Sequence, residues 1–201
     1  MIKAVPTDVA QAAVDALCSL HGLQDDNKPA LKWLTLDVIP WRAQGFEYWD
    51  LWCATAAAWA YAHVGEHLVD GQCVDLTLDP MIAKYFWAST SRLVGKGTRT
   101  YESQGVEPPI EVDPADVRAG DVLLIYTGRT DRLEGDHVAL ARGPHDDATN
   151  VIPTIEGNAQ GKGPDGARMK GVVETSQSID EIARVLRVPL SWMTGTYKDE
   201  L

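Results

Sequence analysis

The sequence has few cysteines, no long apolar run and a shortage of positive charge. Its three cysteines, Cys18, Cys53 and Cys73, are an odd number and too few for a disulfide framework. No apolar run approaches the length of a transmembrane helix, so we expect no membrane insertion. With 18 basic and 29 acidic residues, the net charge is −11. Such a charge argues against nucleic acid or an anionic membrane as a partner.

The remaining composition is that of one globular domain. The 201 residues are 45% apolar, which is enough for a sizeable core. This length favours a single domain over 1–201, with room for an insertion. The first 17 residues include Pro6, Asp8 and Asp15 and have no uninterrupted apolar core. We therefore expect no secretory signal peptide.

The residues around Cys53 predict a helix whose first turn carries a thiol. Asp50 is a suitable N-cap, the alanines after Cys53 favour a helix, and Gly65 is well placed to end it. Unpaired N–H groups and the helix dipole favour the nucleophilic thiolate at such a position. The small alanine side chains would also let a sheet approach closely. The alternative is a buried structural cysteine.

The rest of the chain predicts an α+β fold. Helices are expected at 7–23 and 30–36, with Trp33 and Leu34 delivered to the core. The segment 67–114 is poorly patterned, and we interpret it as an insertion or a substrate-facing lobe. Helices followed by short strands indicate an antiparallel meander. The expected strands are 122–126, 137–142, 151–156, 172–174 and 183–189.

A cysteine nucleophile needs a base, and the base needs a group that orients it. His63 and His67 follow Cys53 by ten and fourteen residues, which on a helix is roughly 15 Å or more. Their spacing also suits a metal pair, but no third ligand is evident, and a solvated helix end is the favoured interpretation. Two further histidines lie at a helix end and in a polar turn. His137, at the start of a strand, is therefore the candidate base.

The expected hairpin supplies a partner for His137. If 137–142 pairs with 151–156 about the loop centre, Glu156 lies directly opposite His137 on the same face. Pro153 favours an edge position or a bulge for the second strand, and a bulge there could shift this register by one. Asn158 is a second candidate to hold the ring. The alternatives are an exposed carboxylate at a strand end and an ordinary turn residue.

Four short segments follow one another along the chain. They are Trp-Cys-Ala at 52–54, Ala-Gly-Asp-Val at 119–122, Asp-His-Val-Ala-Leu at 136–140 and Thr-Ile-Glu-Gly-Asn at 154–158. Together they resemble the successive motifs of CHAP amidases, which belong to the broader NlpC/P60-like set of papain-related peptidoglycan hydrolases. The segments 171–173 and 184–189 also resemble the final strands of such domains. The resemblance extends over residues 7–190 but is carried by these short motifs.

The resemblance implies a papain-like fold in which the nucleophile helix packs on an antiparallel β-meander. It implies that Cys53 is the nucleophile, His137 the base, Glu156 the orienting acid and Asn158 an auxiliary polar group. The implied reaction cleaves an amide bond of the cell-wall peptide through a cysteine thioester. The tryptophans next to the cysteine, Trp49 and Trp52, are expected to line the substrate groove.

Two features depart from the family pattern. His137 follows Cys53 by 84 positions, which is long for the family, and the excess falls within 67–114. Some members bind calcium through acidic residues just before the cysteine, but here only Glu47 and Asp50 are available. We therefore expect no calcium and no other cofactor.

The expected partner is peptidoglycan, with a delivery apparatus or a cognate immunity protein as further candidates. Without a signal peptide, the protein would be made in the cytoplasm. It would reach the cell wall or periplasm by phage lysis, with a virion or through a secretion system. Two rival hypotheses remain: a papain-like protease that acts on a protein, and a cell-wall-binding module that has lost catalysis.

Overall fold

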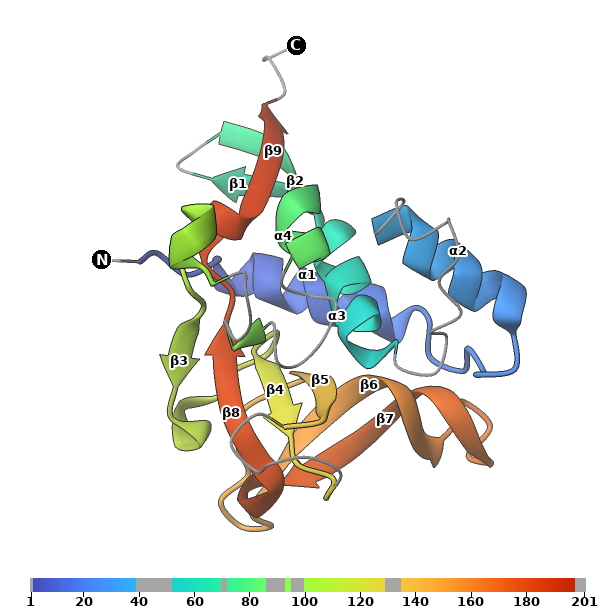
Figure 1. Ribbon diagram of the computed structural model, residues 1–201. Coiled ribbons are helices and arrows are strands. Elements are labelled where there is room, and N and C mark those ends of the chain that lie inside the picture. Colours follow the sequence, from blue (N-terminus) through green and yellow to red (C-terminus); the bar gives the residue numbers. More distant parts are fainter. Residues whose placement is uncertain are drawn as a thin grey trace.

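The structure is a computed structural model that describes residues 2–38, 52–69, 72–85, 93–94, 100–128 and 135–197. The α+β prediction is confirmed: helices accompany two antiparallel sheets (Figure 1). The helices are α1 (Thr7–Cys18), α2 (Lys28–Val38), α3 (Cys53–Ala62) and α4 (Pro80–Tyr85), with 3-10 turns at Glu102–Gln104, Pro114–Asp116, Ile179–Glu181 and Leu190–Trp192. The strands are β1 (Gly65–Val69), β2 (Gln72–Leu78), β3 (Ile110–Val112), β4 (Val122–Ile125), β5 (His137–Ala141), β6 (Val151–Lys162), β7 (Arg168–Ser178), β8 (Ile182–Arg187) and β9 (Met193–Tyr197).

The two expected N-terminal helices are present with different bounds. α1 ends at Cys18, and a short turn leads to Gly22, whose φ of 98° suits glycine. In α2, Leu34 is buried as predicted, but the prediction for Trp33 was wrong, because its side chain is 53% exposed. The buried side of α2 carries Leu31, Leu34, Thr35 and Val38, and at about 100° per residue Trp33 points away from that side. The Trp33 ring instead lies edge-on to Trp59, with centroids 5.9 Å apart.

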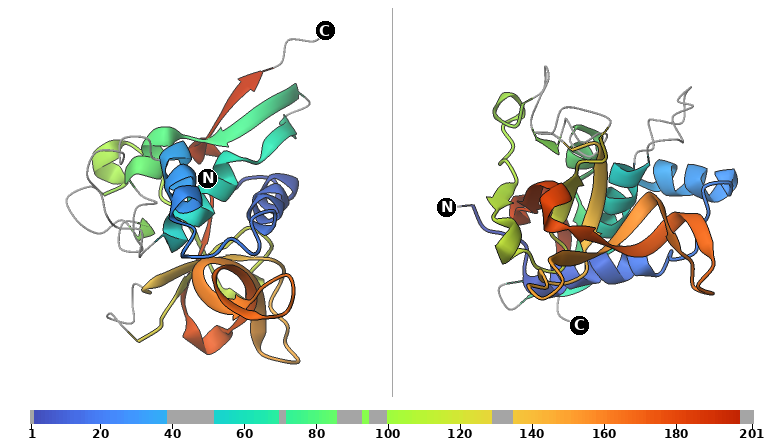
Figure 2. Two further views of the ribbon diagram at one scale, coloured as in Figure 1. Left: turned by 90° about the vertical axis from the view of Figure 1, so that its right-hand side faces the viewer. Right: turned by 90° about the horizontal axis from the view of Figure 1, so that it is seen from below.

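The larger sheet has six strands in the order β3-β8-β4-β5-β6-β7. The meander prediction is confirmed for β4 to β7, which pair consecutively, and β8 returns to pair with β4. Helices α1 and α3 lie across one side of this sheet, and the β6–β7 ribbon coils beyond them (Figures 1 and 2). The main core lies between the helices and the sheet, and a smaller core covers the other face.

Strand β6 is central and not an edge, so the prediction based on Pro153 was wrong on this point. β6 lies between β5 and β7. Pro153 is tolerated because pairing with β5 stops at Thr154, which is opposite Ala141. Beyond that point the Pro153 carbonyl still accepts a hydrogen bond from the Arg142 N–H at 2.8 Å. The missing proline N–H therefore falls just outside the ladder with β5, although Pro153 is paired with Ser176 of β7.

The Ala-Gly-Asp-Val segment joins the sheet to the helices. A Cβ on Gly120 would lie 2.6 Å from the Ala10 carbonyl oxygen of α1, and its φ is 84°, so only glycine fits this contact. The buried Asp121 carboxylate accepts hydrogen bonds from the Arg187 guanidinium at 2.8 and 2.9 Å. This motif therefore has a scaffolding role.

The smaller sheet, in the order β1-β2-β9, was not predicted. Its first two strands come from the segment 67–114 and the residues just before it, and β9 comes from near the C-terminus. The same segment is also tied to the chain end by Trp192, which donates to the Glu107 carbonyl at 2.8 Å and stacks on Tyr101. No helix in the described ranges combines the length and apolarity needed to cross a membrane.

Candidate active site

Cys53 is the first residue of α3, close to the predicted position. Trp52 precedes the helix without a side-chain cap, and the proposed cap Asp50 lies outside the described residues. The helix ends at Ala62 and not near Gly65, which has a φ of 75° and begins β1. The segment from Cys53 to Tyr61 is buried throughout, and Cys53 is 6% exposed. The thiol therefore sits at the N-terminal end of a buried helix.

The alanine-rich face of α3 does allow a close approach of the sheet. A Cβ placed on Gly157 of β6 would lie 2.5 Å from the Ala56 Cβ and 2.7 Å from the Trp52 ring. Contacts this short do not occur between real side chains, so strand and helix touch at glycine and alanine. This contact fixes how far the start of α3 stands from β5 and β6.

His137 and Glu156 form a hydrogen bond, although the predicted register was wrong. The His137 Nε2 atom donates to the Glu156 Oε2 atom at 2.9 Å. In the sheet, Glu156 lies opposite Ala139 and not opposite His137, a shift of two residues. A shift of two preserves the face, and diagonal neighbours remain within reach of long side chains. Imidazole and carboxylate therefore meet diagonally at the start of β5.

The Glu156 carboxylate is 2% exposed and has three hydrogen-bond donors. Besides His137, the Thr154 hydroxyl donates to its Oε1 atom at 2.5 Å and the Gln177 side-chain amide donates to the same oxygen at 2.6 Å. Thr154 could have been found from its position two residues before Glu156 on the same strand face. Gln177 comes from β7, and no local sequence signal indicates it.

Ionisation of Cys53 and His137 is coupled. Burial raises the pKa of Cys53, but hydrogen bonding to His137, the His137 charge, and the N–H groups of Val138 and Ala54 outweigh it, so the pKa lies below its ordinary value. Burial lowers the pKa of His137, but the hydrogen bonds and charges of Cys53 and Glu156 raise it to about 10. The pair therefore favours thiolate and imidazolium near neutral pH.

Glu156 stays ionised despite its burial. Burial raises the pKa of Glu156, but hydrogen bonds from His137, Thr154 and Gln177 and the His137 charge together hold it below the ordinary value. Because Nε2 of His137 is bonded to Glu156, Nδ1 is the nitrogen available to Cys53. The chain thiol–imidazole–carboxylate is complete in the described residues.

A pocket opens over these three side chains. Asn158 also lines it, with a φ of 59°, a left-handed conformation that asparagine adopts more readily than most residues. Of the two tryptophans expected in the groove, Trp49 lies outside the described residues. Trp52 is 2% exposed and donates from Nε1 to Asp25 at 3.0 Å. This geometry gives Trp52 a packing role beneath Gly157.

The other candidate residues lie apart from this pocket. His63 hydrogen-bonds Asp37 and His67 hydrogen-bonds Asp8, each at 3.0 Å. Neither histidine belongs to a group of three metal-ligating side chains in the described ranges. Cys18 and Cys73 are unbridged, like Cys53.

Comparisons with models of protein families, with curated proteins and with solved structures find no match to this chain.

Proposed function

We propose that the chain is a papain-like cysteine amidase that cleaves an amide bond in the peptide part of peptidoglycan. The single observation that carries this proposal is the hydrogen-bonded series Cys53, His137 and Glu156, in which the thiol lies at the start of a buried helix. A nucleophile, a base and an orienting group in series are what acyl transfer requires. Sugar bonds call instead for paired carboxylates across the scissile bond.

The reaction follows from the charges of the pair. The Cys53 thiolate attacks the amide carbonyl carbon, and the carbonyl oxygen becomes an oxyanion. The Cys53 N–H, which has no acceptor within its own helix, is suited to stabilise that oxyanion. The His137 imidazolium then gives its proton to the leaving amine, and the C–N bond breaks to leave a thioester. Neutral His137 next removes a proton from water, whose attack releases the acid and the thiolate.

Glu156 has a supporting part in this cycle. It keeps one ring nitrogen of His137 occupied, so that the other faces Cys53, and its charge stabilises the imidazolium. The peptidoglycan substrate rests on the motif resemblance, whereas the amide chemistry rests on the geometry. The two parts of the proposal therefore need separate readouts.

Purified sacculi test the proposal directly. Incubation with the protein should release fragments with new free amines and carboxylates and with no new reducing sugar ends. Mass spectrometry of these fragments assigns the bond to the glycan–peptide link, the stem peptide or the cross-bridge. The Cys53→Ala protein is the matched control. Co-sedimentation without release by both proteins would indicate a binding module, and intact sacculi with cleavage of a protein substrate would favour a protease.

A further inference from the structure

The outer part of the β6–β7 hairpin, residues 159–171, is basic, although the protein as a whole is acidic. Residues 159–171 contain three basic residues and one acidic residue, whereas the full chain has 18 and 29. The basic residues are Lys162, Arg168 and Lys170. An acidic protein repels anionic substrates at a distance, so a local basic surface at the pocket favours one kind of ligand there.

The strand register orders these cations along the hairpin. Gln160 lies opposite Lys170, and Lys162 lies opposite Arg168. Because side chains alternate along each strand, Gln160 and Lys170 share a face of the hairpin. Lys162 and Arg168 follow them outward, where Lys162 also lies opposite Glu174. Gln160 and Lys170 both line the pocket that contains Cys53, His137 and Glu156. The basic face therefore begins at the reacting thiol and runs outward along the hairpin.

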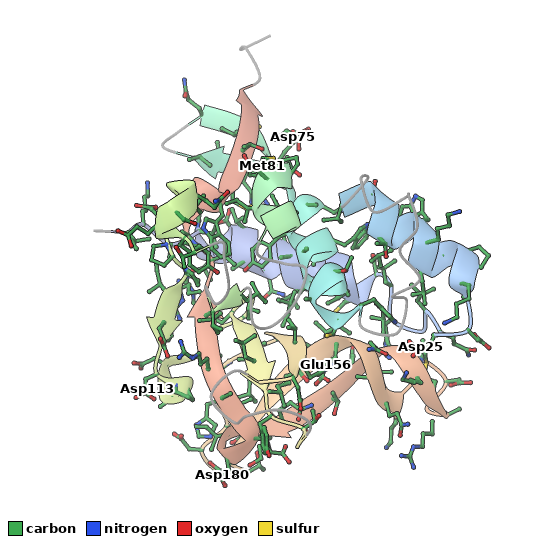
Figure 3. All side chains as sticks on the ribbon, viewed as in Figure 1. Asp25, Asp75, Met81, Asp113, Glu156 and Asp180 are labelled. Atoms are coloured by element: carbon green, nitrogen blue, oxygen red, sulfur yellow. The ribbon has the colours of Figure 1, made fainter. Side chains whose placement is uncertain are left out.

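Lys170 is held in place at the pocket. Its Nζ atom lies 2.6 Å from the Asp25 Oδ2 atom, and its side chain is 50% exposed. The Asp25 N–H donates to the Lys170 carbonyl at 3.0 Å, and the other Asp25 oxygen accepts from the Trp52 Nε1 atom. Figure 3 shows Asp25 above the outer part of the β6–β7 hairpin and Glu156 below α3. An ammonium group has three donors, and Asp25 uses only part of this capacity.

Arg168 extends the basic face. Its Nη2 atom donates to the Gln160 Oε1 atom at 2.8 Å, which joins it to the pocket wall. In the described part of the chain, neither Arg168 nor Lys162 forms an ion pair with a carboxylate. A guanidinium fork with most of its five donors unused is suited to a carboxylate.

We propose that this face of the β6–β7 hairpin binds substrate carboxylates, with Lys170 nearest the scissile bond and Arg168 farther out. The substrate class is then an anionic peptide with a free carboxylate within one or two residues of the cleaved amide. The substrate part of this inference rests on the proposed amidase function. The binding of carboxylates beside the Cys53 thiol does not.

Two alkylating reagents test the carboxylate site without any substrate. N-(iodoacetyl)glycine and N-(iodoacetyl)glycinamide differ only in a carboxylate or a carboxamide one residue from the reacting carbon. Mass spectrometry of the Cys53 peptide gives the alkylation rate for each. We expect Cys53 to react about tenfold faster with the carboxylate reagent, and this preference should decrease at high salt.

The variants assign this preference to the hairpin. Lys170→Gln should reduce the rate ratio to the value that the positive charge of His137 produces without Lys170. Lys170→Arg should retain most of the wild-type ratio. Arg168→Gln, at an exposed position, should reduce it about twofold without a change in fold. The control is Lys3→Gln, an exposed change near the N-terminus, which should leave the ratio unchanged. An unchanged ratio in both Lys170→Gln and Arg168→Gln, with a normal carboxamide rate, would overturn the proposal.

A second measurement separates this inference from the proposed function. Matched peptides that carry a carboxylate or a carboxamide next to the scissile amide give two values of kcat/KM. Loss of the preference in Lys170→Gln supports a carboxylate subsite in catalysis. Cleavage with no preference in wild type overturns the subsite and leaves the amidase intact. A Lys170-dependent alkylation ratio without any cleavage supports the site and contradicts the amidase.

Discussion

The two sides of the candidate site are built on different principles. The helix side supplies the Cys53 sulfur and the Cys53 N–H, from an element whose other inward residues are mainly alanine and aromatic. The sheet side supplies His137 and Glu156 together with two further hydrogen-bond donors, Thr154 and Gln177. The thiol is activated by its hydrogen bond to His137 and by the N–H groups near the helix start, which favour the thiolate. The imidazole requires a network, because a buried carboxylate is costly unless its oxygens are satisfied.

This difference predicts unequal tolerance to substitution. The thiol has no substitute, and nothing beside it can share its role. The Glu156 carboxylate is supported by several hydrogen-bond donors, so the loss of any one of them should reduce activity only in part. Variants ordered by the size of the expected effect can test whether the two sides differ in this way.

The largest effect is expected for Cys53 and His137. Cys53→Ala and His137→Ala should each lower kcat/KM on a cleaved peptide by about 10,000-fold or more, because members of a catalytic unit fail together. Circular dichroism should be unchanged in both. Iodoacetamide at neutral pH should label Cys53 faster than Cys18 or Cys73, since the His137 partner lowers the pKa of Cys53, whereas burial raises the pKa of Cys18. Activity that survives in Cys53→Ala would exclude this mechanism.

A smaller effect is expected for the carboxylate. Glu156→Gln should lower kcat/KM by about 100-fold, because an amide oxygen can still accept from the ring but cannot stabilise imidazolium by charge. The raised pKa of His137 means that activity is present below about pH 10 and is lost above it, as the leaving amine loses its proton donor. In Glu156→Gln this alkaline limit should move to lower pH. Wild-type activity and pH profile in Glu156→Gln would transfer the orienting role to Asn158.

The sequence predicted which side chains meet better than it predicted the strand register. Cys53, His137 and Glu156 were each indicated by local signals: a helix start, a strand start, and the same face of a hairpin. The predicted register placed His137 opposite Glu156, but the observed one places Ala139 there. The error preserved the face because a shift of two residues does so. The sequence pattern predicted that His137 and Glu156 lie on the same face of the sheet, and a shared face was enough for the two side chains to meet.

Other features depended on contacts between distant segments. Gln177 reaches Glu156 from β7, and β9 pairs with β2 from the far end of the chain. Periodicity and spacing within one segment cannot predict contacts between segments that are far apart in the sequence. Trp33 illustrates a different failure, because α2 buries the side that carries Leu31, Leu34 and Val38, and Trp33 lies on the other side. Whether 67–114 faces the substrate stays a prediction, and its described residues do not line the pocket.

The contact between the two sides gives the third prediction. Gly157→Ala adds a methyl group that would lie 2.5 Å from the Ala56 Cβ, so strand and helix must move apart. We expect a loss of about 1–3 kcal/mol in the free energy of unfolding and of about tenfold in kcat/KM, because small displacements of reacting groups are costly.

The matched control for this contact is a rescue. Ala56→Gly removes the opposing methyl but leaves the Trp52 ring 2.7 Å from the added one, so the double variant Ala56→Gly/Gly157→Ala should recover only part of the kcat/KM. Its stability should recover less, because glycine within a helix costs about 1 kcal/mol relative to alanine. Equal activity in the Gly157→Ala variant and the double variant would mean that the contact with the Trp52 ring, and not the contact with Ala56, keeps strand and helix apart.

The smallest expected effect belongs to Gln177, and it changes the opposite end of the pH profile. Gln177→Leu removes one donor to the Glu156 oxygen that also accepts from Thr154. Near pH 7 we expect kcat/KM to fall only about threefold, because the net value of one hydrogen bond is about 1 kcal/mol. The pKa of Glu156 is lowered in the wild type partly by this donor, so it should rise in the variant.

The sign of that shift distinguishes positioning from simple packing. A carboxylate with a lowered pKa stabilises the folded state above its unfolded value of 4.5, and this contribution is lost as the pH falls through the folded pKa. Gln177→Leu should therefore lower Tm at neutral pH more than at strongly acidic pH, and the acid limit of kcat/KM should move to higher pH. Its alkaline limit should stay in place, because the charge of Glu156 beside His137 is retained above that limit. Gln177→Glu, which brings a second carboxylate to the same oxygen, should shift the acid limit further in the same direction. A uniform loss at every pH, with both limits fixed, would show that Gln177 only fills space, and the graded support of the sheet side would then rest on Thr154 alone.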